Sequence, residues 1–226
     1  MSSKSAAGEN FNCVHAAHKN HRKQTQGGEK MVKKLLVLLA VMGLGADLSY
    51  AGTYEVDKVH SSINFSVMHL MVSNVTGPFN HYDAQINFDP NNLAGSSIAA
   101  TVKVASIDTR SADRDNHLKS ADFFDAGKFP EITFRASAIT GSGDQYLLTG
   151  DLSIHGVTKN VAIPVTILGP VKSPQGFDAL GITGQFKLNR KDYGIAWNKA
   201  LDSGGVMVGD DVEVAINIEA HSPAAK

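Results

Sequence analysis

Apolar and polar residues alternate along most of the chain from residue 62 onward, which is the pattern of a β-strand with one buried face. Ile63, Phe65 and Val67 form the first row of apolar residues, with serine and asparagine between them. Seven later rows lie in residues 82–88, 98–104, 132–136, 146–154, 161–167, 180–188 and 212–218. Because Gly, Pro, Asn and Asp separate the rows, the pattern predicts eight strands of an antiparallel all-β domain.

The same pattern predicts little helix. Residues 111–124 form one helical segment between two strands, and a second short helix is expected after His69. The absence of a strand-helix alternation argues against a parallel sheet. Closing eight strands into a barrel would remove the exposed sheet edges, and such a barrel is either filled by side chains or holds one small ligand. Periodicity alone fits a packed sandwich equally well.

Residues 31–51 have the layout of a secretory signal. Two lysines precede an apolar run over 35–46, and the small-x-small sequence Ser49-Tyr50-Ala51 follows it. The run is about a dozen residues, whereas a membrane-spanning helix needs about 20. We therefore expect cleavage after Ala51 and export of the remaining domain to the periplasm.

Residues 1–30 precede this signal and are polar, without periodicity, so we expect them to be a disordered extension. Because a secretory signal normally begins a chain, either translation starts at Met31 or the n-region is unusually long. The only cysteine, Cys13, falls in this extension, so residues 52–226 can form no disulfide and no thiolate metal site. Residues 52–226 are long enough to form one domain of ordinary size.

The net charge of residues 52–226 argues against some classes of function. This part has 14 Lys and Arg against 19 Asp and Glu, a net charge near −5. A mildly acidic domain without a basic stripe is a poor candidate for binding nucleic acid or for polybasic attachment to a membrane. It also has no G-x-S-x-G motif and no glycine-rich phosphate loop before a helix, so neither a serine hydrolase nor a nucleotide-binding protein is supported.

Six motifs, in order along residues 54–220, resemble those of the YceI-like family of secreted, lipocalin-like barrels that bind polyisoprenoid lipids. The first is Tyr54-Glu-Val-Asp57 followed by His60-Ser61-Ser62-Ile63-Asn64-Phe65. The longest, over 106–134, contains Arg114, Asp115, His117, Leu118 and Asp122-Phe123-Phe124-Asp125. The others lie in residues 77–79, 150–159, 189–195 and 208–212.

This resemblance implies a lipocalin-like antiparallel eight-stranded β-barrel with one or two short helices. It implies a carrier and not an enzyme, with an isoprenoid quinone or a prenyl diphosphate inside the barrel and no other cofactor. Such a carrier would make transient contact with a membrane or a membrane redox protein. The residues expected to contact the lipid are Phe65, Phe79, Ile86, Phe88, Val102, Ile132, Phe134, Leu152, Ile154, Val165, Phe186, Trp197 and Ile216.

Arg114 and His117 are the candidate ligands for a lipid head group, since a guanidinium suits bidentate contact with phosphate. Several aspartates surround them in sequence and would repel a phosphate. The alternative, which we favour, is that Arg114 and Asp115 anchor the helix to the barrel.

The six histidines of residues 52–226 are His60, His69, His81, His117, His155 and His221. None forms an HxH, HExxH or i,i+4 pair, so their spacing along the chain does not predict convergence on a metal ion. We expect hydrogen-bonded structural histidines and no metal site.

Two rival functions stay open at this point. One is an enzyme acting on the bound lipid, with His60, His117 or Arg114 as its polar groups. The other is a stress-responsive structural or interaction protein whose barrel is filled by its own side chains.

Overall fold

The computed structural model describes residues 52–202 and 204–223, so the expected extension over 1–30 and the expected signal over 31–51 lie outside the described residues. Ten strands, one α-helix and three short 3₁₀ segments make up the described part. The strands are β1 Gly52–Val56, β2 Ser62–His69, β3 Ser73–Pro78, β4 Tyr82–Phe88, β5 Ser97–Lys103, β6 Glu131–Ser142, β7 Gln145–Ile154, β8 Val157–Lys172, β9 Asp178–Asn189 and β10 Val208–His221. The helical segments are η1 Leu93–Gly95, η2 Val104–Ser106, α2 Ala112–Lys119 and η3 Arg190–Tyr193.

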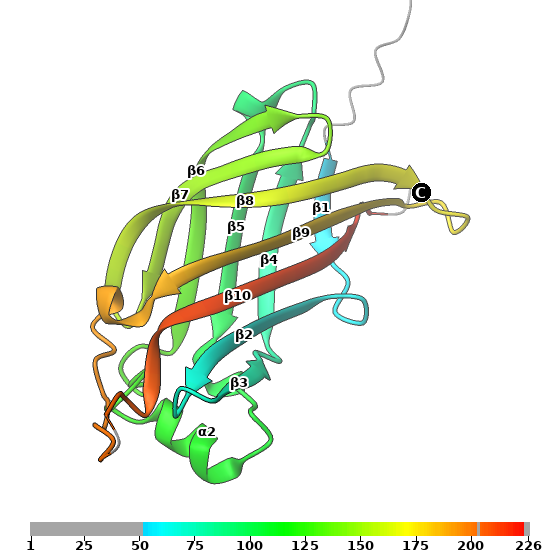
Figure 1. The fold of residues 1–226 in the computed structure, drawn as a ribbon. Coiled ribbons are helices and arrows are strands. Elements are labelled where there is room, and N and C mark those ends of the chain that lie inside the picture. Colours follow the sequence, from blue (N-terminus) through cyan, green and yellow to red (C-terminus); the bar gives the residue numbers. More distant parts are fainter. Residues whose placement is uncertain (1–51, 203, 224–226) are drawn as a thin grey trace, which may run out of the picture. The chain divides into compact units, whose positions relative to one another are not determined.

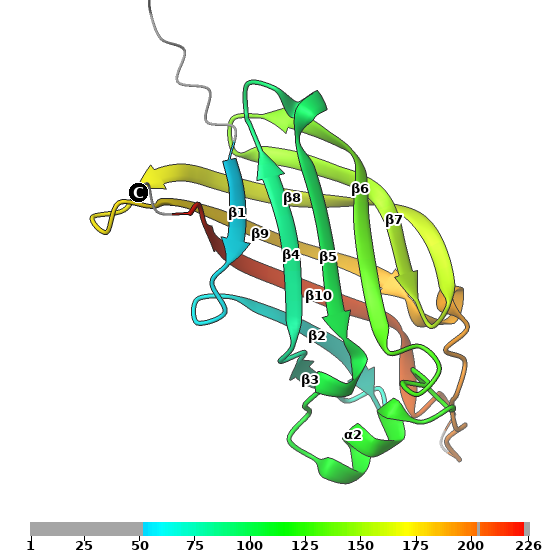
Figure 2. The ribbon, with the colours of Figure 1, turned by 180° about the vertical axis from the view of Figure 1, so that it is seen from behind.

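The strands close into an antiparallel barrel. The order β1-β4-β5-β6-β7-β8-β9-β10 returns to its start because β1 also pairs with β10. Figure 1 shows β8, β9 and β10 crossing in front of β1, β4 and β5, and Figure 2 shows the same arrangement from behind. The barrel that the resemblance implies is thus confirmed, and the packed sandwich is not formed.

The membership of the ring differs from the eight rows expected from periodicity. The closed ring contains β1, which has only five residues and one buried side chain, Tyr54. The row at Ile63, Phe65 and Val67 is β2, which pairs with β10 next to β1 and carries β3 on its other edge. The first motif therefore forms two strands with a turn between them, and β1 is too short for periodicity to reveal.

The second helix expected after His69 is absent from the described residues. Leu70 and Met71 have φ of 51° and 60°, in the left-handed region, and they reverse the chain into β3. Because a right-handed helix cannot run through such residues, the segment forms a tight turn. No helix in residues 52–202 and 204–223 has the length and apolar content needed to cross a bilayer.

The expected helix over 111–124 is present but shorter. Asp113 and Asp115 lie in the first turn of α2, and His117 and Lys119 lie in its last turn. Acidic residues at the start and basic residues at the end of a helix interact favourably with its dipole, so this distribution stabilises the helix. The Ser120 hydroxyl donates to the carbonyl of His117 at 2.7 Å and ends the helix. The chain then turns, and Phe123 is buried in a core cluster at this end of the barrel.

Candidate functional site

The barrel contains two apolar cavities. The first, which we call the upper cavity, has a volume of about 150 Å³. Side chains from seven strands of the ring, β4 to β10, and from β2 line it. Asp83 is the only charged residue among those that line it. An interior so poor in polar groups can bind hydrocarbon but offers almost nothing to hydrogen-bond a polar ligand.

The lower cavity, of about 110 Å³, lies at the end where α2 sits. Phe65 and Val67 of β2 line it, together with Leu118 of α2 and Phe123 and Phe124 after it. Its one charged lining residue is Arg190. The helix and the following turn thus provide an apolar floor to this end of the barrel.

A ring of five apolar side chains separates the two cavities. Each of the five lines both spaces: Phe79, Ile132, Ile154, Leu188 and Val214. Pockets for small ligands usually measure about 300–1,000 Å³, more than either cavity offers. A long hydrocarbon could therefore lie along the barrel only if this constriction opens.

Eleven of the thirteen residues expected to contact lipid line one or both cavities. They are Phe65, Phe79, Ile86, Val102, Ile132, Phe134, Leu152, Ile154, Val165, Phe186 and Ile216. Phe88 and Trp197 line neither. Phe88 is 1% exposed and packs edge-on against Tyr146 with ring centres 5.4 Å apart, and Trp197 packs against His117 and Phe123 near α2. Both aromatic residues therefore pack against other side chains outside the cavity walls.

The two candidate head-group residues also lie outside the cavity walls. Arg114 donates from Nε to Thr109 Oγ1 at 2.8 Å and from Nη2 to the carbonyl of Thr109 at 2.7 Å. Asp115 Oδ1 accepts from the backbone N–H and the hydroxyl of the same threonine. His117 Nε2 lies 2.9 Å from Asp122 Oδ2. Arg114 and Asp115 thus hold α2 to Thr109 in the segment that precedes it, and these contacts do not reach a strand of the barrel.

Arg190 is a buried cation that sequence reasoning did not single out. Its side chain donates to four backbone carbonyls, from Nε to Gly209 at 2.9 Å, from Nη1 to Ile195 and Trp197 at 2.8 Å each, and from Nη2 to Val208 at 3.4 Å. Burial lowers its pKa, and nearby Asp210 opposes that shift. With its donors engaged in this way, Arg190 joins η3 and the following loop to β10 and is not free to hold a head group.

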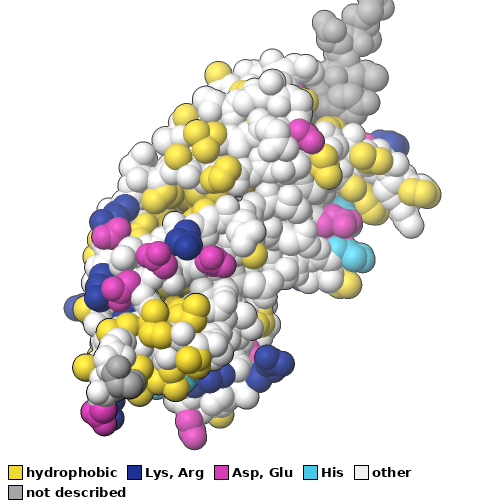
Figure 3. All heavy atoms as spheres, viewed as in Figure 1, with side chains coloured by type: hydrophobic (Ala, Val, Ile, Leu, Met, Phe, Trp, Pro, Cys, Tyr) yellow, Lys and Arg dark blue, Asp and Glu magenta, His cyan; other side chains and the backbone are white. Residues whose placement is uncertain are grey.

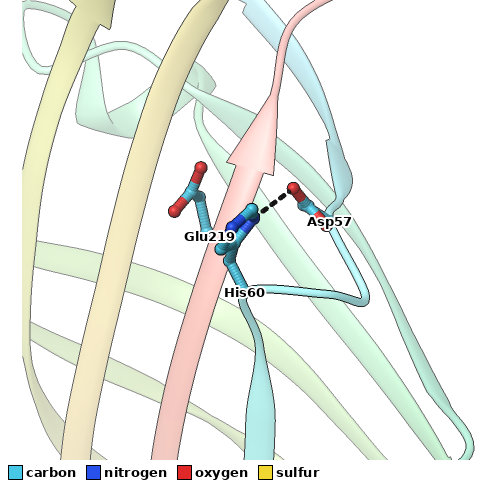
Figure 4. Close-up of side chains that lie close together, drawn as sticks. All are labelled: Asp57, His60 and Glu219. Atoms are coloured by element: carbon cyan, nitrogen blue, oxygen red, sulfur yellow. Dashed lines mark hydrogen bonds and ion pairs between the residues drawn. The ribbon is translucent and has the colours of Figure 1, made fainter.

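On the outer wall of the barrel, acidic and histidine side chains that are far apart in the sequence form a cluster. Asp57 and His60 lie in the turn between β1 and β2, and Glu219 lies on β10 (Figure 4). His221, also on β10, lies beside Glu219. Hydrogen bonds from the His60 side chain and the Val59 N–H hold the pKa of the Asp57 carboxyl below its usual value. The same pairing with Asp57 raises the pKa of His60. The Asp-x-x-His and Glu-x-His spacings were visible in the sequence, but their meeting depends on how β1 and β2 share the edge of β10.

The turn between β2 and β3 exposes apolar side chains. Leu70, Met71 and Val72 are 37%, 56% and 80% exposed, and Met68 at the end of β2 is 37% exposed. Figure 3 shows hydrophobic side chains gathered at this end of the molecule. Val67, which directly precedes Met68, lines the lower cavity, so the exposed residues follow in sequence on one that faces the interior.

Fold and interior together define a lipocalin-like β-barrel with an apolar core. The chain belongs to the YceI-like family, because residues 54–220 match the YceI-like domain. A UPF0312 protein of Staphylococcus aureus strain N315 is 38% identical over 167 residues, which cover 74% of this chain and 95% of the relative.

Solved structures share the fold. The YCEI protein of Campylobacter jejuni is 34% identical, with a TM-score of 0.60 over 69% of this chain and 90% of that one. A domain from Saccharophagus degradans, described as polyisoprenoid-binding and implicated in plant cell wall breakdown, aligns with a TM-score of 0.57 over 76% of this chain and 99% of that one. It is only 17% identical, so this likeness concerns the fold.

Proposed function

We propose that the protein is an exported carrier that holds a polyisoprenoid, such as an isoprenoid quinone or a prenyl diphosphate, lengthwise inside the barrel. The observation that carries this proposal is the pair of apolar cavities divided only by apolar side chains. Burial of each CH₂ contributes about 0.8 kcal/mol, so a few isoprene units could exceed the roughly 8 kcal/mol of a micromolar complex. The Saccharophagus domain, which has the same fold, offers a precedent for this class of ligand.

A long ligand would bind by spreading the five-residue constriction, so the two cavities would merge along the barrel axis. No reaction is part of this proposal. The residues that an isoprenoid-modifying enzyme would use, His60, His117 and Arg114, do not line either cavity and have hydrogen-bond partners elsewhere. That placement favours carriage over catalysis.

Substituting a larger side chain at the constriction tests the proposal. Val214→Phe places a ring between the cavities, whereas Ala215→Phe adds an aromatic ring at the neighbouring position, on the opposite face of β10. We expect the parent protein and Ala215→Phe to retain an isoprenoid, and Val214→Phe to lose most of it. Overpacking of this kind costs about 1–3 kcal/mol, so a folded variant is expected.

Native mass spectrometry followed by organic extraction measures the outcome. An isoprenoid recovered unchanged from the parent protein supports the proposed carrier function. A chemically converted isoprenoid would instead support an enzyme that acts on the bound lipid. A parent protein that neither retains nor takes up isoprenoids would overturn the carrier and favour a structural or interaction protein.

We further propose that the exposed turn at Leu70–Val72 contacts the membrane from which the lipid is taken. Its apolar side chains are exposed and follow closely in sequence on Val67, which lines the lower cavity. The net charge near −5 over residues 52–226 favours an uncharged bilayer surface over an anionic one. Met71→Asp should abolish flotation with phosphatidylcholine vesicles. Aspartate tolerates the left-handed backbone of this position, so the fold should be preserved.

The matched control is Val171→Asp, which charges a valine that is 64% exposed near the end of β8. It should leave vesicle binding unchanged. Equal binding by the parent protein and Met71→Asp would exclude the turn as the contact site.

A further inference from the structure

Three potential metal ligands converge where β1 and β2 meet the edge of β10. One ligand atom each from Asp57, His60 and Glu219 lies within 4.8 Å of the other two. Asp57 Oδ2 is 2.7 Å from His60 Nδ1, and Figure 4 shows these side chains together with Glu219. The three groups come from a turn and a strand more than 150 residues apart in the sequence.

A fourth potential ligand lies beside them. His221 Nε2 is 2.7 Å from Glu219 Oε1 and 3.8 Å from Asp57 Oδ2. Its ring stacks on Phe177 with the ring centres 4.0 Å apart and the planes at 25°. That stacking holds the imidazole with Nε2 toward the two carboxylates.

The charges of the cluster suit a cation. Asp57 and Glu219 form ion pairs only with His60 and His221 among the described residues, and no lysine or arginine there lies within 4.0 Å of either carboxylate. The neighbouring Lys58 pairs instead with Asp83. Two carboxylates therefore stand next to two imidazole rings, whose nitrogens can bind a metal ion.

We propose that Asp57, His60, Glu219 and His221 form a binding site for a divalent transition-metal ion, with Zn²⁺ the best match. Two imidazoles and two carboxylates are a set that zinc accepts, whereas Ca²⁺ and Mg²⁺ prefer oxygen ligands only. Zinc bonds of 2.0–2.1 Å in a tetrahedron place ligand atoms about 3.3 Å apart. The contacts within the cluster lie on both sides of that spacing, so side-chain rotations of modest size would form the site. The expectation of no metal rested on histidine spacing along the chain and on the lack of a cysteine in residues 52–226, neither of which shows which side chains meet in the fold.

A metal ion at this position would strengthen the closure of the barrel. Only two residue pairs join β1 to β10, Glu55 with His221 and Val56 with Ala220. Asp57 and His60 belong to the turn that follows β1, whereas Glu219 and His221 belong to β10. Coordination would tie the two sides of this short seam together, independently of any lipid in the barrel.

Zinc titration of the full chain tests the site, with Glu219→Gln as the main variant. This change removes a charge but keeps the shape of a half-exposed side chain, so the fold should be retained. Glu213→Gln is the control, on the same face of β10 but outside the cluster. Comparing variants also removes the contribution of His15, His18 and His21, which every variant keeps.

We expect isothermal titration to give one more zinc equivalent in the parent protein and in Glu213→Gln than in Glu219→Gln. In the variant the dissociation constant of this site should rise at least about tenfold, since even loss of an outer-shell partner has that effect. Zinc should also raise the melting temperature of the parent protein and not that of Glu219→Gln. A second variant, His60→Gln, should reproduce the loss. Identical zinc stoichiometry and identical melting shifts in parent and Glu219→Gln would overturn the proposal and leave a hydrogen-bonded cluster only.

Discussion

Phe134→Asp should eliminate lipid retention and lower the free energy of unfolding by at least about 3 kcal/mol. Phe134 faces its neighbours Ala100 and Leu152 across β5 and β7, and it lines the upper cavity. Truncating a core phenylalanine alone costs about 3–5 kcal/mol, and an unpaired carboxylate in an apolar space adds to that cost. Isoprenoid content after extraction and the urea midpoint measure the two effects.

Thr133→Asp is the control for this change, because adjacent residues of a strand face opposite sides of the sheet. Thr133 pairs with Thr101 and Ser153 on the outer face of the barrel. Its substitution should shift stability by no more than about 0.5 kcal/mol and should leave binding intact. If Thr133→Asp lost the ligand while Phe134→Asp stayed folded and loaded, the inward face assigned to β6 would be wrong.

Arg190→Met should destabilise the domain by roughly 3 kcal/mol or more. The methionine fills similar space, but the carbonyls of Ile195, Trp197 and Gly209 lose their donor. Each buried acceptor left unsatisfied costs about 1–3 kcal/mol. Chemical unfolding followed by circular dichroism gives the change in the free energy of unfolding.

Lys191→Met is the matched control, at the next residue and with the same removal of one positive charge. Lys191 is exposed and its ammonium pairs with Asp210 at 2.8 Å, a contact that is expected to be worth about 1 kcal/mol or less. Similar destabilisation by the two substitutions would mean that charge, and not the bonds to the carbonyls, sets the importance of Arg190. Arg190→Lys should recover only part of the loss, because an ammonium cannot reproduce the planar fork of a guanidinium.

Alternation of apolar residues predicted the long strands well, because each of them has one face in the barrel interior. The row from Val161 to Ile167 and the row from Val212 to Ile218 both lie within observed strands. The same signal could not reveal β1, which is too short, or the left-handed turn at Leu70 and Met71, where the apolar residues point to solvent.

Some residues of the candidate site could likewise be predicted from the sequence, and others could not. Lining residues such as Ile86 and Val165 follow directly from which face of a strand is apolar. The role of Arg190 and the meeting of His60 with Glu219 depend on contacts between segments far apart in the chain. Such contacts are fixed by strand register and loop geometry, which periodicity along one strand does not contain.

The two cavities also determine how the domain should respond to hydrostatic pressure. Pressure favours unfolding because internal voids disappear when water surrounds the chain, with volume changes of about −20 to −100 mL/mol in ordinary proteins. Voids of about 150 and 110 Å³ in one small barrel correspond to roughly 160 mL/mol, so they are large enough to account for a change of that size. A hydrocarbon that fills them would remove that volume difference, so the loaded domain should be stiffer and harder to unfold by compression than the empty one.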